Sequence, residues 1–309
     1  MIFPTFIAEG AFNWSSKGYH YRLTESERDR LLSERLSSDP WQVLARVVEL
    51  GKMGNFTEVS SLAGLFDTSK THNIAPAALL VTGDLGSRTD LERLVEVMRK
   101  GPDGLRVYAC QAARNAGCLW LVPHMLDAWN RSSGSDVHEQ IGLAIADLLD
   151  SVEVLDDVGP VGRLAQSFEV QYGSLDPASK VGVLARKIAK NRSNGDFGAV
   201  VNEGYCRLLE ICKSDNEVVW AGERSGVIEL ANHFLKMLLP SKYEITQAPL
   251  TVVLREKFEA ATGLNCSAFY IAERFVQGAA VHVLEEFLAS QPSRSFRTGA
   301  RYFFGHIIS

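Results

Sequence analysis

The chain has 309 residues, of which 46% are hydrophobic and 22% charged, and its formal net charge at pH 7 is −5. This balance excludes global disorder and supplies enough apolar residues for a sizeable core. The acidic balance argues against nucleic acid as a partner, because phosphate contacts require clustered Lys and Arg side chains.

The five cysteines are an odd set without the Cys-x-x-Cys spacing of zinc and redox sites: Cys110, Cys118, Cys206, Cys212 and Cys266. Such a set is typical of a reducing compartment. The first 12 residues have no basic start and no long apolar centre, so they do not resemble a signal peptide. No apolar run approaches the ~18 residues that span a bilayer. We therefore expect a soluble, cytoplasmic protein that does not contact membranes.

Residues 1–23 mix aromatic side chains with Gly and Ser too irregularly for a helix, and they predict an ordered arm that covers one end of the core. A capping box that starts at Thr24 then begins the first helix. A second helix is expected to have Asp39 as its N-cap and Pro40 in its first position, and Gly51 is its expected end.

From residue 55 onward, helical patterns recur in pairs. The expected pairs are 57–66 with 74–85, 90–99 with 105–116, and 119–129 with 137–149. Thr89 is the expected N-cap of the third of these helices. Ala78 and Ala109 lie 31 residues apart, as do Gly86 and Gly117. Small residues at a constant offset let neighbouring units pack closely, which predicts HEAT-like helical hairpins, with an irregular helical bundle as the alternative.

Breaks at 156–162 and 173–177 divide the chain into HEAT-like hairpins over residues 24–155 and a helical lobe over residues 156–309. Helical patterns return in this lobe at 178–190, 198–212, 217–239, 249–261 and 268–288. Residues 291–309 show no helical period and are expected to form a non-helical tail. The expected fold class is all-α, with a HEAT-like helical hairpin solenoid in the N-terminal half and a further helical C-terminal lobe.

Motifs of catalytic chemistry do not occur in the sequence. No serine lies in a Gly-x-Ser-x-Gly elbow, and the seven histidines form neither a His-Glu-x-x-His motif nor a metal-ligand spacing. The glycines between Gly83 and Gly86 lack the lysine of a phosphate loop and are typical of helix-ending turns. We therefore expect no enzyme, no cofactor and no metal site; a helical-repeat enzyme with an unrecognised site is the alternative.

An acidic stretch without Lys or Arg is the candidate partner-binding site, and its carboxylates are Asp147, Asp150, Glu153, Asp156 and Asp157. Carboxylates without local compensation would attract a cationic surface on a partner. A solvated helix end is the alternative interpretation of the same residues.

Near the C-terminus, arginines alternate with aromatic residues between Arg294 and Phe304. This pattern is compatible with a stacking contact to nucleic acid. With only three arginines, we favour the other interpretation, in which Tyr302, Phe303 and Phe304 are buried anchors of the chain end.

The ending from Gly299 to Ile307, with Tyr-Phe-Phe-Gly-His at its centre, resembles the closing signature of a family of HEAT-like immunity proteins from bacterial polymorphic toxin systems. The segment Gly263 to Cys266 resembles an upstream step of the same family, although Ser267 stands where a proline is expected. The resemblance implies an immunity protein that binds a cognate toxin domain and occludes its active site, without catalytic residues. A HEAT-like scaffold or adaptor with another protein partner is the alternative.

Overall fold

A computed structural model gives the fold and describes residues 23–33, 39–66, 74–149, 197–212, 217–220, 223–239, 248–271, 274–290, 295–297 and 299–308. Within these ranges the protein is all-α, and each strand spans only two or three residues. Residues 1–22 of the expected arm at 1–23 and the helix expected at 178–190 lie outside the described residues.

The α-helices are α1 (Glu25–Ser33), α2 (Pro40–Lys52), α3 (Ile74–Leu85), α4 (Arg88–Lys100), α5 (Asp103–Ala116), α6 (Val122–Arg131), α7 (Ser135–Leu149), α11 (Phe197–Ile211), α12 (Val227–Leu238), α13 (Ala248–Thr262) and α14 (Gln277–Ala289). Short 3₁₀ helices are η2 (Val59–Leu65), η3 (Leu119–Leu121) and η5 (Cys266–Phe269). Three antiparallel hairpins are formed by β1 (Val219–Trp220) with β2 (Glu223–Arg224), β3 (Tyr270–Ile271) with β4 (Arg274–Phe275), and β5 (Arg301–Phe303) with β6 (His306–Ile308).

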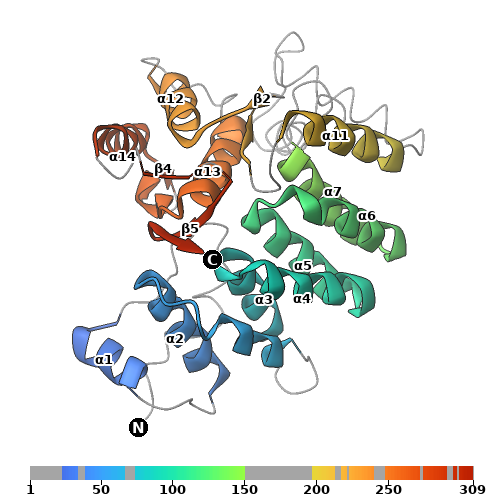
Figure 1. Cartoon of the computed structure of the whole chain (residues 1–309), viewed down its shortest axis with the longest axis horizontal. Coiled ribbons are helices and arrows are strands. Elements are labelled where there is room, and N and C mark those ends of the chain that lie inside the picture. Colours follow the sequence, from blue (N-terminus) through green and yellow to red (C-terminus); the bar gives the residue numbers. More distant parts are fainter. Residues whose placement is uncertain are drawn as a thin grey trace.

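Helices α3 to α7 are stacked in two neighbouring layers (Figure 1). In one layer α3 packs on α5 and α5 packs on α7, while in the other α4 packs on α6. The layers contact each other through α4 with α5 and α6 with α7, and α11 extends the stack by contacting α6 and α7. These contacts join α3 to α7 and α11 into one packed body of helices, and the HEAT-like solenoid stays a prediction.

Small residues allow α3 and α5 to approach closely, as their spacing predicts. Ala109, Ala112 and Ala113 of α5 are all fully buried. A Cβ atom added to Gly83 of α3 would overlap the carbonyl group of Ala112. Gly83 therefore lies inside a helix and serves close packing, whereas it was expected in a helix-ending turn; Gly86 does follow the end of α3.

The local start signals of α1 and α2 act as expected. The Thr24 backbone N–H donates to the Glu27 carboxylate at 2.9 Å, which completes the predicted capping box. The Trp41 N–H donates to the Asp39 side chain at 3.0 Å. The predicted end of α2 is wrong by one residue, because Gly51 is still helical and buried, and the helix ends at Lys52.

Other boundaries differ from the sequence-based expectations. α4 begins with Ser87 as its N-cap and Asp90 as the reciprocal acceptor, so Thr89 is not the cap. The helix expected at 57–66 is the 3₁₀ helix η2, where the Ser61 hydroxyl donates to the Glu58 carbonyl at 2.6 Å and competes with α-helical pairing. The helix expected at 119–129 starts as η3, because Pro123 suits the first turn of α6 but cannot donate within a longer helix.

The helices of the C-terminal lobe enclose a separate aromatic core. Phe234 of α12 packs edge-on against Phe269 with ring centroids 5.7 Å apart, and Phe258 of α13 packs against Phe287 of α14 at 5.0 Å. The helices expected at 217–239 and 268–288 start only at Val227 and Gln277, because a β-hairpin precedes each. The first strands of these hairpins, Val219–Trp220 and Tyr270–Ile271, consist of β-branched and aromatic residues, and such residues favour strands.

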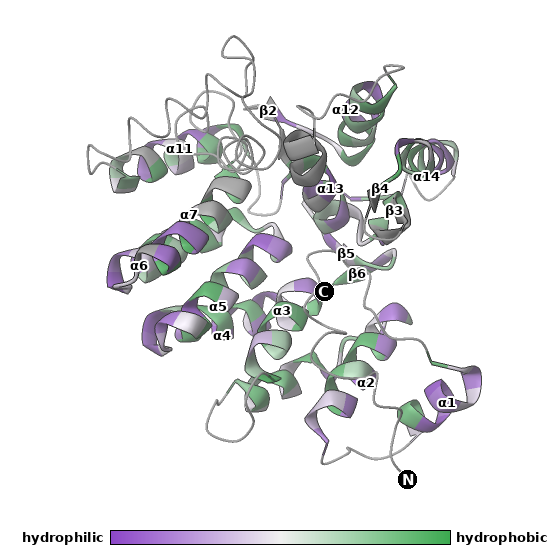
Figure 2. Cartoon of the chain, turned by 180° about the vertical axis from the view of Figure 1, so that it is seen from behind, coloured by the Kyte–Doolittle hydropathy of each residue, from purple (hydrophilic) through white to green (hydrophobic). Residues whose placement is uncertain are grey.

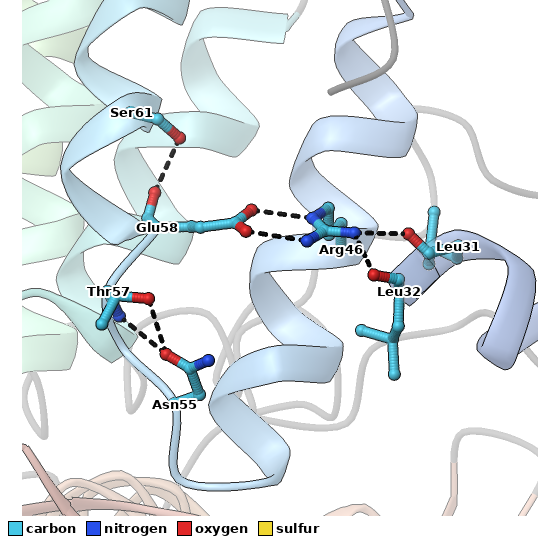
Figure 3. A network of polar contacts seen from close by, with 7 residues as sticks. All are labelled: Leu31, Leu32, Arg46, Asn55, Thr57, Glu58 and Ser61. Carbon is cyan, nitrogen blue, oxygen red and sulfur yellow. Dashed lines mark hydrogen bonds and ion pairs between the residues drawn. The ribbon is translucent and has the colours of Figure 1, made fainter. Parts of the chain in front are cut away.

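The helices α1 and α2 are joined to η2 by the side chain of Arg46 (Figure 3). Its guanidinium donates to the carbonyls of Leu31 and Leu32, at the end of α1, at 2.9 and 2.5 Å. The opposite edge forms two hydrogen bonds of 2.8 Å with the carboxylate of Glu58. This bidentate contact lowers the pKa of the Glu58 carboxyl group, chiefly through hydrogen bonding.

The β5–β6 hairpin lies between the helical stack and the C-terminal lobe (Figure 1). Its turn residues Phe304 and Gly305 have φ angles of +48° and +80°, as tight two-residue hairpin turns require. Tyr302 and Phe303 are buried and Phe304 is half-buried, which confirms the prediction that they anchor the chain end. The Phe304 N–H also donates to the Gly263 carbonyl, after α13, at 2.7 Å.

Arg301 of β5 is only 8% exposed and enters the stack at the C-terminal ends of α3 and α5. Its Nε donates to the Ala116 carbonyl at 3.0 Å, and its Nη atoms donate to the carbonyls of Gly83, Asp84 and Gly86. The last carbonyls of an α-helix have no intrahelical donors, so this one side chain satisfies acceptors of two helices.

We expect the substitution Arg301→Met to lower the free energy of unfolding by roughly 2–4 kcal/mol, because it leaves buried carbonyl groups without donors. Urea unfolding monitored by circular dichroism measures the change. Arg297→Met removes a nearby exposed arginine and serves as the matched control. Equal unfolding midpoints for the two variants would show that Arg301 is dispensable to the fold.

A second prediction concerns pH. Because the folded-state pKa of Glu58 is lowered, its stabilising contribution is present above the ordinary glutamate pKa and is lost as the pH falls through the folded value. Glu58→Gln should reduce stability at pH 7 by about 1 kcal/mol and weaken the loss of stability on acidification. Urea titrations from pH 7 to pH 3 test this, with Glu92→Gln on α4 as an exposed control. Parallel pH profiles for wild type and Glu58→Gln would contradict the prediction.

Candidate partner-binding surface

The acidic stretch that the sequence offers as a candidate site lies mostly outside the described residues. The backbone of Asp147 lies in the last turn of α7. The other predicted residues, Asp150, Glu153, Asp156 and Asp157, lie outside the described residues. The acidic binding site therefore stays a prediction.

The thiols of Cys110 and Cys212 are not activated nucleophiles. Burial raises the pKa of the Cys110 thiol far above its ordinary value. Partial burial and the nearby Glu217 carboxylate raise the pKa of Cys212 to about 11. A reactive cysteine requires a lowered pKa, so both side chains remain protonated at neutral pH.

No cluster of three or more His, Cys, Asp or Glu residues suited to a metal ion occurs within the described part of the chain.

A stacked group of side chains lies on the outer layer of the helices, where α4 meets α6. The guanidinium carbon of Arg88 lies 4.0 Å from the ring centroid of Trp120. The Trp120 ring also contacts His124 edge-on, with centroids 6.0 Å apart and planes at 80°. Arg88 is exposed, while Trp120 and His124 are half-buried. We name Arg88, Trp120 and His124 the α4–α6 patch.

Local structure fixes each member of this patch. The Ser87 cap places Arg88 in the first position of α4. Trp120 lies in η3, and His124 follows four residues later in the first turn of α6, so the two rings point to the same side. Figure 2 shows hydrophilic residues along parts of α4 and α6.

The electrostatic environment keeps His124 neutral at physiological pH. Its pKa is lowered first by partial burial, and the positive charges of Arg99 and Arg88 lower it further, whereas Asp127 opposes the shift. A neutral imidazole can both donate and accept a hydrogen bond. The patch thus offers an aromatic surface, a cation and a two-way hydrogen-bonding group.

This combination suits protein recognition better than catalysis. Arg and Trp are enriched among the residues that dominate binding energies at protein interfaces, and an aromatic ring gives a large contact area at a small entropic cost. A hydrolytic or transfer reaction would need a nucleophile beside His124, and the patch residues provide none. We therefore treat the α4–α6 patch as a candidate partner-binding surface.

The sequence analysis did not find this patch, although a signal was present. Arg88 and Trp120 lie 32 residues apart, close to the 31-residue offset of Ala78 with Ala109. Equivalent positions in successive helical units lie side by side, so a charged and an aromatic residue at the repeat offset predict a contact.

If Arg99 contributes to the lowered pKa of His124, the substitution Arg99→Gln should raise that pKa. A titration of the imidazole resonances by NMR gives both values directly. Lys236→Gln, on α12, removes an equal charge from an exposed position and should leave the His124 titration unchanged. A His124 pKa that is the same in wild type and Arg99→Gln would exclude Arg99 as a cause and leave burial and Arg88.

No helix of the described ranges is long and apolar enough to cross a membrane. Comparisons with protein-family models, with curated proteins and with solved structures found no match.

Proposed function

We propose that the chain is an immunity protein, which binds one cognate toxin domain of a bacterial polymorphic toxin system and neutralises it by occluding the toxin's active site. It acts in the cytoplasm, where a toxin that enters or is made in the cell must be blocked. Inhibition by occlusion needs no chemistry, so the proposal includes no enzymatic activity, no cofactor and no metal.

The observation that carries this proposal is that both segments of the family resemblance meet in space. Gly263, in the upstream segment, accepts the backbone hydrogen bond of Phe304, in the closing signature. Gly263 has a φ angle of +66°, and a Cβ atom at this position would overlap the backbone of Tyr302. The shared residues therefore belong to one structural unit, and they are of the kind that a common fold would preserve.

The all-α architecture also suits tight binding. Toxin–immunity pairs can reach dissociation constants of roughly 10⁻¹³ M, which requires a surface that loses little conformational freedom on association. Packed helices such as α4 and α6 present their side chains from a rigid backbone. The α4–α6 patch supplies the type of aromatic and cationic anchor that such an interface needs.

Co-expression with toxin genes from the same locus tests the proposal. We expect the chain to restore growth of cells that produce one of these toxins and to co-purify with that toxin domain. A toxin from an unrelated locus is the control and should not be neutralised. Stable co-purification with a different cellular protein, without protection against any toxin of the locus, would favour the scaffold or adaptor instead.

Affinity measurements with the toxin domain identified in this way test whether the α4–α6 patch is part of the interface. Trp120→Ala should weaken binding of the cognate toxin by roughly 30-fold or more if the ring is an interface anchor. The matched control is Leu239→Ala, which removes an exposed apolar side chain after α12, away from the patch. Equal affinities for wild type and Trp120→Ala would place the interface elsewhere without affecting the proposed function.

A further inference from the structure

A groove lies on the opposite side of α4 from the α4–α6 patch. It has a volume of about 420 Å³ and is open to solvent. Its lining comes from η2, α4 and the start of α5, and its apolar part includes Ala63, Phe66, Val97 and Leu105. Phe66 and Val97 are half-buried, so they retain exposed apolar surface at the groove.

The charges of the groove are not balanced. Two lining side chains, Arg93 and Lys100, are cationic, whereas Glu96 is the acidic one. The Glu96 carboxylate is already engaged, since it lies 2.6 Å from Lys100 Nζ and 3.6 Å from the Arg99 guanidinium. These cations lower the pKa of Glu96, with the Lys100 hydrogen bond as the largest cause. Glu96 therefore stays ionised and paired at neutral pH.

Arg93 is the cation that lacks such compensation within the described residues. It is exposed, and its guanidinium makes one long hydrogen bond of 3.5 Å, to the backbone carbonyl of Ser60 in η2. This contact brings the charged end of Arg93 to the η2 side of the groove. An arginine next to apolar surface favours a carboxylate ligand that can pair with it bidentately.

We propose that this groove binds a segment of the toxin domain in which apolar side chains enter between Phe66, Val97 and Leu105 while a neighbouring Asp or Glu pairs with Arg93. The inference rests on the proposed function and specifies the chemistry of the partner. Nucleic acid does not fit, because the groove is largely apolar and phosphate binding needs several clustered cations. A protein segment with alternating apolar and acidic side chains can pack against the apolar lining and pair with Arg93 at the same time.

The groove and the α4–α6 patch lie on two sides of one helix. A partner that covers the exposed face of α4 can therefore engage both, with Trp120 on one side and Phe66 on the other. Interfaces of standard size bury about 800 Å² on each partner, which is more than either feature provides alone.

The experiment measures affinity and association rate for the toxin domain that the wild type neutralises. Ala63→Arg fills the groove, and Arg93→Glu reverses its uncompensated charge. Each should raise the dissociation constant by about 30-fold or more. Two controls are Ser61→Arg, an exposed position of η2 outside the groove, and Lys236→Glu, which makes the same charge change on α12; both should bind as the wild type does. Circular dichroism melting curves establish that all four variants are folded.

The outcomes separate this inference from the proposed function. Loss of affinity in the two groove variants alone supports the groove, and a toxin Asp or Glu whose change to Lys restores binding to Arg93→Glu identifies the paired carboxylate. Unchanged binding in all four variants overturns the groove and leaves the immunity function in place. Failure of the wild type to bind any toxin of the locus overturns both.

Discussion

Arg301 reaches from β5 into the C-terminal ends of α3 and α5. The placement of the C-terminal lobe against the helical stack depends on this contact. Burying a guanidinium costs several kcal/mol unless its donors find acceptors. Here the acceptors are the carbonyls of Gly83, Asp84, Gly86 and Ala116. Each helix C-terminus also carries a partial negative charge of about −0.5, so the ends of two helices together compensate the buried cation.

The hairpin that carries Arg301 then positions its neighbours. Phe303 packs into the core beneath α2 and α3, while the N–H of Phe304 binds the carbonyl after α13. A similar use of arginine occurs at the N-terminal end, where Arg46 joins the carbonyls at the end of α1 to Glu58. The difference is the counter-charge: Arg46 has a carboxylate and is partly solvated, whereas Arg301 relies on backbone carbonyls in the interior.

Local signals predicted where most of the described helices lie, because caps and apolar periodicity act within a few residues, but they misplaced the cap of α4 at Thr89 and the end of α2 at Gly51. The expected helix at 74–85 coincides with α3, and the constant offset of Gly86 and Gly117 marks equivalent ends of α3 and α5. What binds those ends was not predictable, because Arg301 lies 185 residues from Ala116 and 218 from Gly83. The hairpins at Trp220 and Ile271 were missed for a different reason, since such short strands carry too few residues to show a period of two.

The C-terminal lobe covers one layer of the helical stack, and this decides which layer is free to bind a partner. Helical-repeat proteins often bind partners along one continuous layer of helices. In this chain the layer of α3 and α5 contacts β5 and α13, so that side is already occupied by the protein itself (Figure 1). Nearly all of α3 is buried, chiefly by α5, η2 and α2, whereas α4 keeps most of its charged residues exposed. Among the described helices of the stack, the layer of α4 and α6 is therefore the one left to a partner, and both the aromatic patch and the groove lie on it.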